Sequence, residues 1–175
     1  NGHVYPEVDL PEIGIGYAEP NFLLDNNGKG RFADVSQASG PGLEIVKVSR
    51  GVTVADYDED GDLDLFVFNL NDTPSLLRND GGNRHNWLRI KLIGTRSNRD
   101  GIGAWVTVES AERIQRQEVQ GGGGYISHSD IRRHFGLGTS TLVDRVEVRW
   151  PSGITQTLRD VAINQTLTVV EPAEP

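Results

Sequence analysis

The sequence contains no cysteine and no methionine. Without cysteine the chain forms no disulfide, no thiolate metal ligand and no thiol nucleophile. Its 175 residues carry 17 basic and 25 acidic side chains, which give a formal net charge of -8 at pH 7. Because an acidic surface repels nucleic acid, we expect no nucleic-acid partner. No apolar run approaches the roughly 20 residues of a membrane-spanning helix, which predicts no transmembrane segment.

Glycine, in contrast, is abundant, and the 21 glycines lie between short apolar runs. Alternation of apolar and polar residues with a period of two recurs, for example in "LRIKLI" at Leu88–Ile93. In "DRVEVRW" the apolar Val146, Val148 and Trp150 share one face, and the "PSG" that follows predicts a turn into a return strand. The sequence therefore predicts an all-β fold rich in hairpins.

Two segments of the first half resemble each other, "NFLLDNNGKGRF" at 21–32 and "PSLLRNDGGNRHNW" at 74–87. Each has a pair of leucines, a turn with asparagine and glycine, and an aromatic residue. The leucine pairs are about fifty residues apart, a spacing typical of propeller blades. The second half shows no further copy, and the turn at 81–86 is rich in glycine and asparagine. We therefore expect one domain over residues 1–85 and another over residues 86–175.

The segment "ADYDEDGDLDLFVF" at 55–68 places six carboxylates in nine residues. Two carboxylates about 4 Å apart repel by roughly 4 kcal/mol at an effective dielectric constant of about 20, so water or a cation must neutralise such a run. Its acids and its glycine have the spacing with which a calcium-binding loop begins. The spacing predicts a Ca²⁺ site with side-chain ligands Asp56, Asp58 and Asp60, a main-chain ligand at Asp62, and Asp64 closing the site.

Other readings of these residues stay open. The acidic run could be a solvated turn without a metal, and Mg²⁺ fits less well because it demands an octahedral site rich in water.

The pair Asn98 and Asp100 could belong to a second cation loop or to a plain turn. His128, Asp130 and His134 are residue types that bind zinc, but an extended strand would place the last of them too far from the others.

The stretch "GVTVADYDEDGDLDLFVFN" resembles the FG-GAP/VCBS-type repeat of integrin-like propellers. Downstream, "NWLRIKLIGTRSNRDGIGAWVTV", "GGGGYISHSD", "HFGLG" and "VEVRWPSG" occur in the order of an ASPIC/UnbV domain, and the chain resembles the cartilage acidic protein family and its bacterial homologues. The resemblance implies a partial β-propeller blade or blades with a calcium loop over residues 1–85 and a β-sandwich-like domain over 86–175. It also implies the C-terminal part of a larger protein that is secreted, periplasmic or on the cell surface.

This resemblance, and the lack of a recognisable catalytic constellation, favour a non-enzymatic, calcium-stabilised adhesion or interaction module with a protein or glycan partner. About 85 residues do not close a propeller of four to eight blades, so we expect the rest of a propeller or another chain to cover the first domain. Two alternatives remain. The chain could be the C-terminal part of a carbohydrate-active or other hydrolase, or an accessory subunit of a larger membrane-associated or extracellular assembly.

Overall fold

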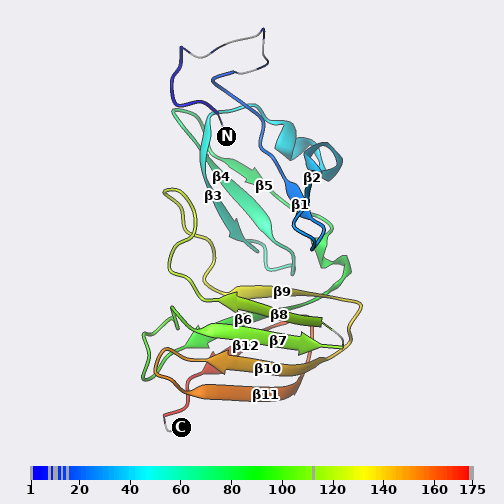
Figure 1. The fold of residues 1–175 in the computed structure, drawn as a ribbon, viewed down its shortest axis with the longest axis vertical. Coiled ribbons are helices and arrows are strands. Elements are labelled where there is room, and N and C mark those ends of the chain that lie inside the picture. The colour runs from blue at the N-terminus through cyan, green and yellow to red at the C-terminus, as the bar shows by residue number, and fades with distance from the viewer. Residues whose placement is uncertain are drawn as a thin grey trace. The chain divides into compact units, whose positions relative to one another are not determined.

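The computed structural model describes residues 2–7, 9, 12, 14, 16–111 and 113–173. Regular structure in these residues consists of β-strands in four sheets and a few short 3-10 helices, without an α-helix (Figure 1). This confirms the predicted all-β class, and no helix of the described residues is long and apolar enough to cross a membrane. The chain forms two compact units. Unit 1 comprises Asn1–Ala55, Asp64–Arg78 and Gly124–Ser127, and unit 2 comprises Asp56–Leu63, Asn79–Gly123 and His128–Pro175.

Unit 1 contains a three-stranded antiparallel sheet with the strand order β3-β4-β5, next to a separate two-stranded hairpin. A propeller blade has four strands, so the three-stranded sheet corresponds to the partial blade that the sequence predicts. The elements of unit 1 are β1 (Leu24–Asn26), β2 (Phe32–Asp34), η2 (Ser36–Ser39), η3 (Pro41–Glu44), β3 (Ser49–Ala55), β4 (Asp64–Asn69) and β5 (Ser75–Leu77).

The two similar sequence segments of the first half have different strand pairings. The first segment forms the hairpin of β1 and β2, with Leu24 opposite Asp34. The second segment contributes β5 to the sheet of unit 1 and begins β6 (Asn86–Ile93) in a sheet of unit 2, after the short helix η4 (Gly82–Arg84). Their likeness is therefore local, because strand pairing depends on partners that are distant in sequence.

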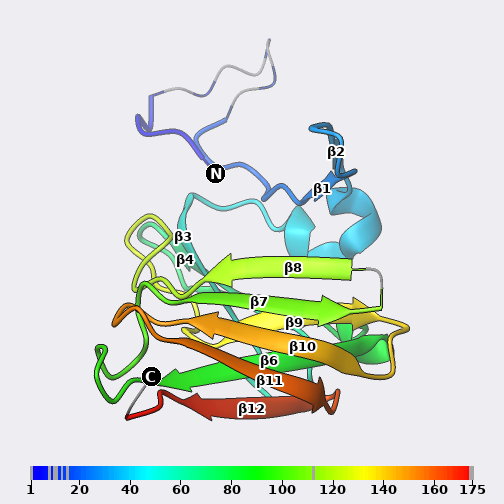
Figure 2. The same ribbon diagram turned by 60° about the horizontal axis from the view of Figure 1, so that its bottom comes forward.

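Unit 2 has a four-stranded sheet with the order β11-β10-β7-β8 and a three-stranded sheet with the order β12-β6-β9 (Figure 2). Neighbouring strands are antiparallel except β12 and β6, which run parallel. Besides β6, the strands are β7 (Trp105–Ser110), β8 (Arg113–Glu118), β9 (Arg133–Gly138), β10 (Val143–Arg149), β11 (Thr155–Val161) and β12 (Gln165–Val170).

The core of unit 2 is formed by side chains of both sheets. Val146 and Val148 of β10 are fully buried, and Trp150 directly after them is buried as well. They belong to one apolar cluster with Leu88 of β6 and Phe135 of β9. The predicted hairpin is present, because β10 and β11 pair around the turn after Trp150. Two sheets that enclose one core are the β-sandwich-like arrangement that the family resemblance implies.

A buried carboxylate fastens the chain directly after β12. Glu171 is only 2% exposed, and it accepts hydrogen bonds from the main-chain N–H groups of Thr95, Arg96 and Ser97 at 2.7–2.9 Å. The hydroxyls of Ser97 and Ser152 donate to its other oxygen at 2.8 and 2.5 Å. Burial raises the pKa of Glu171, but these donors together outweigh it and lower the pKa to about 2.

We predict that Glu171→Gln destabilises unit 2 in a pH-dependent way. The pKa of the folded state lies below the ordinary value of 4.5, so the carboxylate stabilises the fold fully above about pH 4.5 and loses this effect as the pH falls towards about 2. At pH 7 the substitution should lower the free energy of unfolding by about 2–3 kcal/mol, because it removes a charged hydrogen-bond acceptor.

Thermal unfolding between pH 2 and pH 7 tests this. The difference between the variant and the wild type should shrink steadily below pH 4.5, and an equal difference at pH 3 and pH 7 would contradict the prediction. Glu147→Gln is a control, since Glu147 is partly exposed in an ion pair with Arg145. Glu147→Gln should lower the free energy of unfolding by less than about 1 kcal/mol.

Candidate metal site

The acidic run forms the loop of the hairpin between β3 and β4, and Ala55 pairs with Asp64 where the strands meet the loop. Gly61 has φ +101°, a left-handed conformation that favours glycine. A Cβ atom at this position would lie only 2.2 Å from Nε1 of Trp87, so the side chain of Trp87 also excludes anything larger. Backbone conformation and packing therefore both demand glycine at the turn that the sequence predicts.

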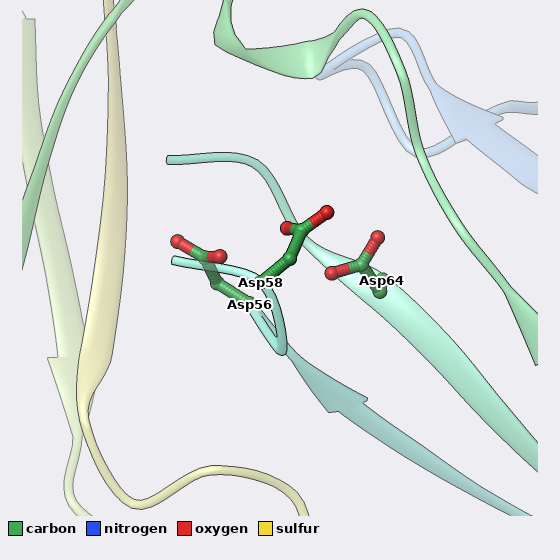
Figure 3. A group of neighbouring side chains, drawn as sticks. All are labelled: Asp56, Asp58 and Asp64. Carbon is green, nitrogen blue, oxygen red and sulfur yellow. The ribbon is translucent and has the colours of Figure 1, made fainter. Parts of the chain in front are cut away.

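Three carboxylates of this hairpin lie together. Asp56 and Asp58 come from the loop and Asp64 begins β4, and each offers one oxygen within 4.8 Å of the other two (Figure 3). Two oxygens bound to one Ca²⁺ at 2.3–2.6 Å are at most about 5 Å apart, so the spacing fits a single ion. The donors are all carboxylate oxygens, the ligands that hard cations prefer. The residues present therefore fit calcium.

The other two acids of the predicted site lie outside this group of three. One carboxylate oxygen of Asp60 accepts the N–H of Asp62 at 3.0 Å, and the other accepts the amide of Asn83 at 3.1 Å. The buried Asp62 accepts the N–H of Gly82 at 3.1 Å. Both acids therefore tie the loop to itself and to residues 82–83, and their predicted roles as calcium ligands stay predictions.

A buried arginine, which the sequence analysis did not identify, neutralises one side of the loop. Arg89 of β6 is 3% exposed, and its Nη1 donates to Oδ2 of Asp56 at 2.7 Å. Its Nη2 forms an ion pair with Glu59, and its Nε donates to the hydroxyl of Thr166 at 2.9 Å. The guanidinium also lies 5.6 Å from the ring centre of Trp87. The protein thus supplies a cation to the acidic loop by itself.

A second arginine extends this network. Arg132 donates to Glu59 at 2.9 Å and lies 2.6 Å from Asp130. Its hydrogen bond lowers the pKa of Glu59, although partial burial opposes the shift. Glu59 itself has φ +60°, an uncommon conformation for a non-glycine residue. Glu59, the only glutamate of the acidic run, therefore forms ion pairs with arginine, and it is not part of the close carboxylate group.

The histidine candidates do not form a metal group in the described residues, where the only cluster of three suitable side chains is that of the hairpin loop. Asp130 pairs with Arg132. His134 stacks on Trp87 with the ring centres 5.8 Å apart. Burial, and then the charge of Arg89, lowers the pKa of His134. This arrangement favours a packing role for His134 over a role as a zinc ligand.

No sequence signal pointed to Arg89. The side chains of Leu88, Ile90 and Leu92 are buried, so alternation would place Arg89 on the opposite, solvent-facing side of the strand. It lies 33 residues from Asp56, and no local spacing rule connects residues so far apart. Only the folded chain brings them together.

Comparison with known proteins defines the class of this chain. The sequence model of the FG-GAP-like repeat matches residues 10–67, which include β3, the acidic loop and most of β4. The model of the ASPIC and UnbV family matches residues 94–175, which belong to unit 2 except for Gly124–Ser127. The hairpin with the acidic loop therefore belongs to a propeller-type repeat. The chain is a member of the family in which FG-GAP-like repeats are followed by an ASPIC/UnbV domain.

Cartilage acidic protein 1 is a similar protein from several vertebrates. The proteins of Mus musculus and Homo sapiens are 30% identical to this chain over 141 residues, and that of Xenopus tropicalis is 29% identical over 147 residues. The matches cover 77–81% of this chain but 21–22% of the relatives. The chain thus spans about a fifth of the length of the curated relatives that it matches.

We predict that Gly61→Ala destabilises the protein more than Gly153→Ala does. Both glycines have a positive φ, but a Cβ at Gly153 meets no atom within 4 Å. Gly153→Ala therefore measures backbone strain alone, whereas Gly61→Ala adds the collision with Trp87. The difference should be about 1–3 kcal/mol, as for overpacking in a core. Urea unfolding of both variants measures it, and equal losses would show that Trp87 moves aside freely.

Proposed function

We propose that the chain is a non-enzymatic, calcium-stabilised interaction module of an extracytoplasmic protein. The observation that carries the proposal is the group of three carboxylate oxygens from Asp56, Asp58 and Asp64 within 4.8 Å of one another. These residues would hold Ca²⁺, with Asp60 and Asp62 supporting the loop as further ligands or through their hydrogen bonds. The ion would supply the positive charge that lets the carboxylates approach.

The proposed calcium role is structural. Extracellular calcium modules bind with dissociation constants near 10⁻⁴–10⁻³ M. At a hundredfold excess of calcium over such a constant, binding adds about 2.7 kcal/mol to the free energy of unfolding. The name of the vertebrate relatives refers to cartilage, a tissue rich in extracellular matrix, which supports a secreted, periplasmic or cell-surface location with free calcium.

The proposed partner is another protein surface, either further repeats of a propeller or another chain. Among the described residues, most exposed large apolar side chains belong to unit 1, whereas nearly all buried ones belong to unit 2. On one face of the three-stranded sheet Phe66 packs edge to face against Phe68 and lies opposite Leu76 in the strand register. Phe68 and Leu76 are 44% and 48% exposed. A face of this kind needs a cover.

An enzymatic role has less support from these residues. A glycoside hydrolase needs two carboxylates across a pocket, about 5–9 Å apart. Here the close carboxylates gather in a single hairpin loop. The pocket in unit 1, about 190 Å³, is lined by neutral residues and Arg50 and contains no carboxylate.

The domain boundary between residues 85 and 86 is part of the proposal, with the repeat before it and the ASPIC/UnbV domain after it.

We predict that Asp58→Ala abolishes calcium binding with little effect on stability in a chelator. Asp58 is the exposed member of the close group, so its loss removes a ligand without opening the interior. The wild type should melt several degrees higher in 10 mM calcium than in excess chelator, because a ten- to hundredfold excess over the dissociation constant adds about 1.4–2.7 kcal/mol to the free energy of unfolding. Asp100→Ala is the matched control and should keep the full calcium shift. If Asp58→Ala keeps both calcium binding by calorimetry and the thermal shift, the proposed site is wrong.

We also predict that the isolated chain self-associates through the uncovered face of the β3-β4-β5 sheet. Substituting Phe68→Ser together with Leu76→Thr removes exposed apolar area and should shift the chain to a monomer of 19.2 kDa without lowering its melting temperature. Light scattering after size exclusion over a range of concentrations measures this. Ile114→Ser, at a 69% exposed position of unit 2, should change nothing. A wild type that is monomeric at all concentrations would speak against the need for a cover.

A further inference from the structure

Arg89 makes a set of contacts that a surface arginine does not make. Its side chain is 3% exposed, and that of Asp56 is fully buried. A charge in the interior is tolerated only when it is paired and hydrogen-bonded. Arg89 meets this condition with Asp56 at 2.7 Å, Glu59, and the hydroxyl of Thr166 at 2.9 Å. The pair is therefore part of the interior of unit 2.

The same contacts fix the position of Asp56. Its Oδ2 accepts from Nη1 of Arg89 and, at 2.9 Å, from the N–H of Gly61, while its Oδ1 accepts from the N–H of Asp60 at 3.1 Å. Asp56 thereby closes the loop on itself through two main-chain donors and links it to β6 through Arg89. Each of these bonds joins two groups of the protein itself.

We propose that Arg89 is a built-in counter-ion of the acidic loop, which holds the loop folded in the absence of calcium. Calcium binding then adds stability to a loop that is already formed, and it is not the condition for folding. The second half of this inference, that calcium adds stability to a loop that is already formed, rests on the proposed calcium site. The first half, that Arg89 holds the metal-free loop, concerns the residues of unit 2 alone.

Charge and geometry both support this role. Calcium and a guanidinium are both cations, and both would lie beside the carboxylate of Asp56. A loop that has lost Arg89 retains a buried carboxylate without its cation, which is strongly destabilising. Added calcium can replace part of the missing positive charge. The calcium-dependent gain in stability should therefore be larger when Arg89 is absent.

The experiment compares the wild type with Arg89→Met, Asp56→Asn, the Asp56→Asn/Arg89→Met double variant, and Arg132→Met. Melting temperatures are measured with excess chelator and with 10 mM calcium as the probe, about ten times a weak extracellular dissociation constant. Arg132→Met is the matched control, because Arg132 also pairs with Glu59, but its second carboxylate partner is Asp130 and its side chain is more exposed, at 23%.

In chelator, Arg89→Met should melt roughly 10–20 °C below the wild type, as the loss of one partner of a buried ion pair implies. The double variant should regain most of this loss, because a neutral asparagine leaves no uncompensated charge. Arg132→Met should lose much less. In calcium, the rise in melting temperature should be larger for Arg89→Met than for the wild type, and it should vanish in the double variant.

Three results would overturn the proposal. Arg89→Met could melt like Arg132→Met in chelator, or the double variant could be no more stable than Arg89→Met. The calcium-induced rise could also be the same or smaller in Arg89→Met, which would make Arg89 a support for the metal and not its substitute. If Arg89→Met does not fold, a folded double variant supports the proposal and an unfolded one contradicts it.

Failure of the calcium site itself gives a different pattern. The wild type and Arg89→Met would then both melt at the same temperature with calcium and with chelator, which overturns the second half of the proposal. The comparison of the single and double variants in chelator would still decide whether Arg89 holds the loop.

Discussion

The ion pair between Arg89 and Asp56 is the interaction on which the acidic hairpin loop depends most. Six acids lie within nine residues of the chain, and their mutual repulsion opposes a tight turn. Arg89 removes part of that repulsion from within the fold, and its buried position strengthens the interaction because little water competes for the charges. Trp87 lies on the same strand, and its side chain packs where a Cβ atom at position 61 would otherwise lie. One strand, β6, therefore supplies both the charge and the shape that the loop requires.

The acids of the loop divide into roles that their spacing alone does not show. Asp56 serves the turn, the arginine and the close carboxylate group at once. Glu59 is turned to Arg89 and Arg132 by a left-handed backbone conformation. Asp60 and Asp62 accept hydrogen bonds within the loop and from residues 82–83. A metal site can thus be small although the run of acids is long, because the remaining carboxylates shape the loop.

Unit 2 has the features of a self-sufficient core, and unit 1 does not. The two sheets of unit 2 enclose a continuous apolar cluster, and the buried carboxylate of Glu171 fastens the end of the chain with main-chain and hydroxyl donors. In unit 1 the phenylalanines of β4 keep an apolar face at the surface. A propeller-type repeat buries its faces against its neighbours. The difference between the two units therefore agrees with a repeat that acts as part of a larger assembly.

The sequence by itself determined the features that depend on near neighbours in the chain. Alternation predicted the strands and the buried side of β10, where Val146 and Val148 are inaccessible. The spacing of acids and glycine predicted a turn at Gly61 and an all-oxygen group around Asp56, because a loop of this length is governed by local geometry. The tertiary structure alone decided what lies next to that loop. Alternation along β6 gives no sign that Arg89 pairs with Asp56, and the two leucine-containing segments pair differently although their sequences are alike. Both depend on contacts between residues far apart in the chain, which local patterns do not encode.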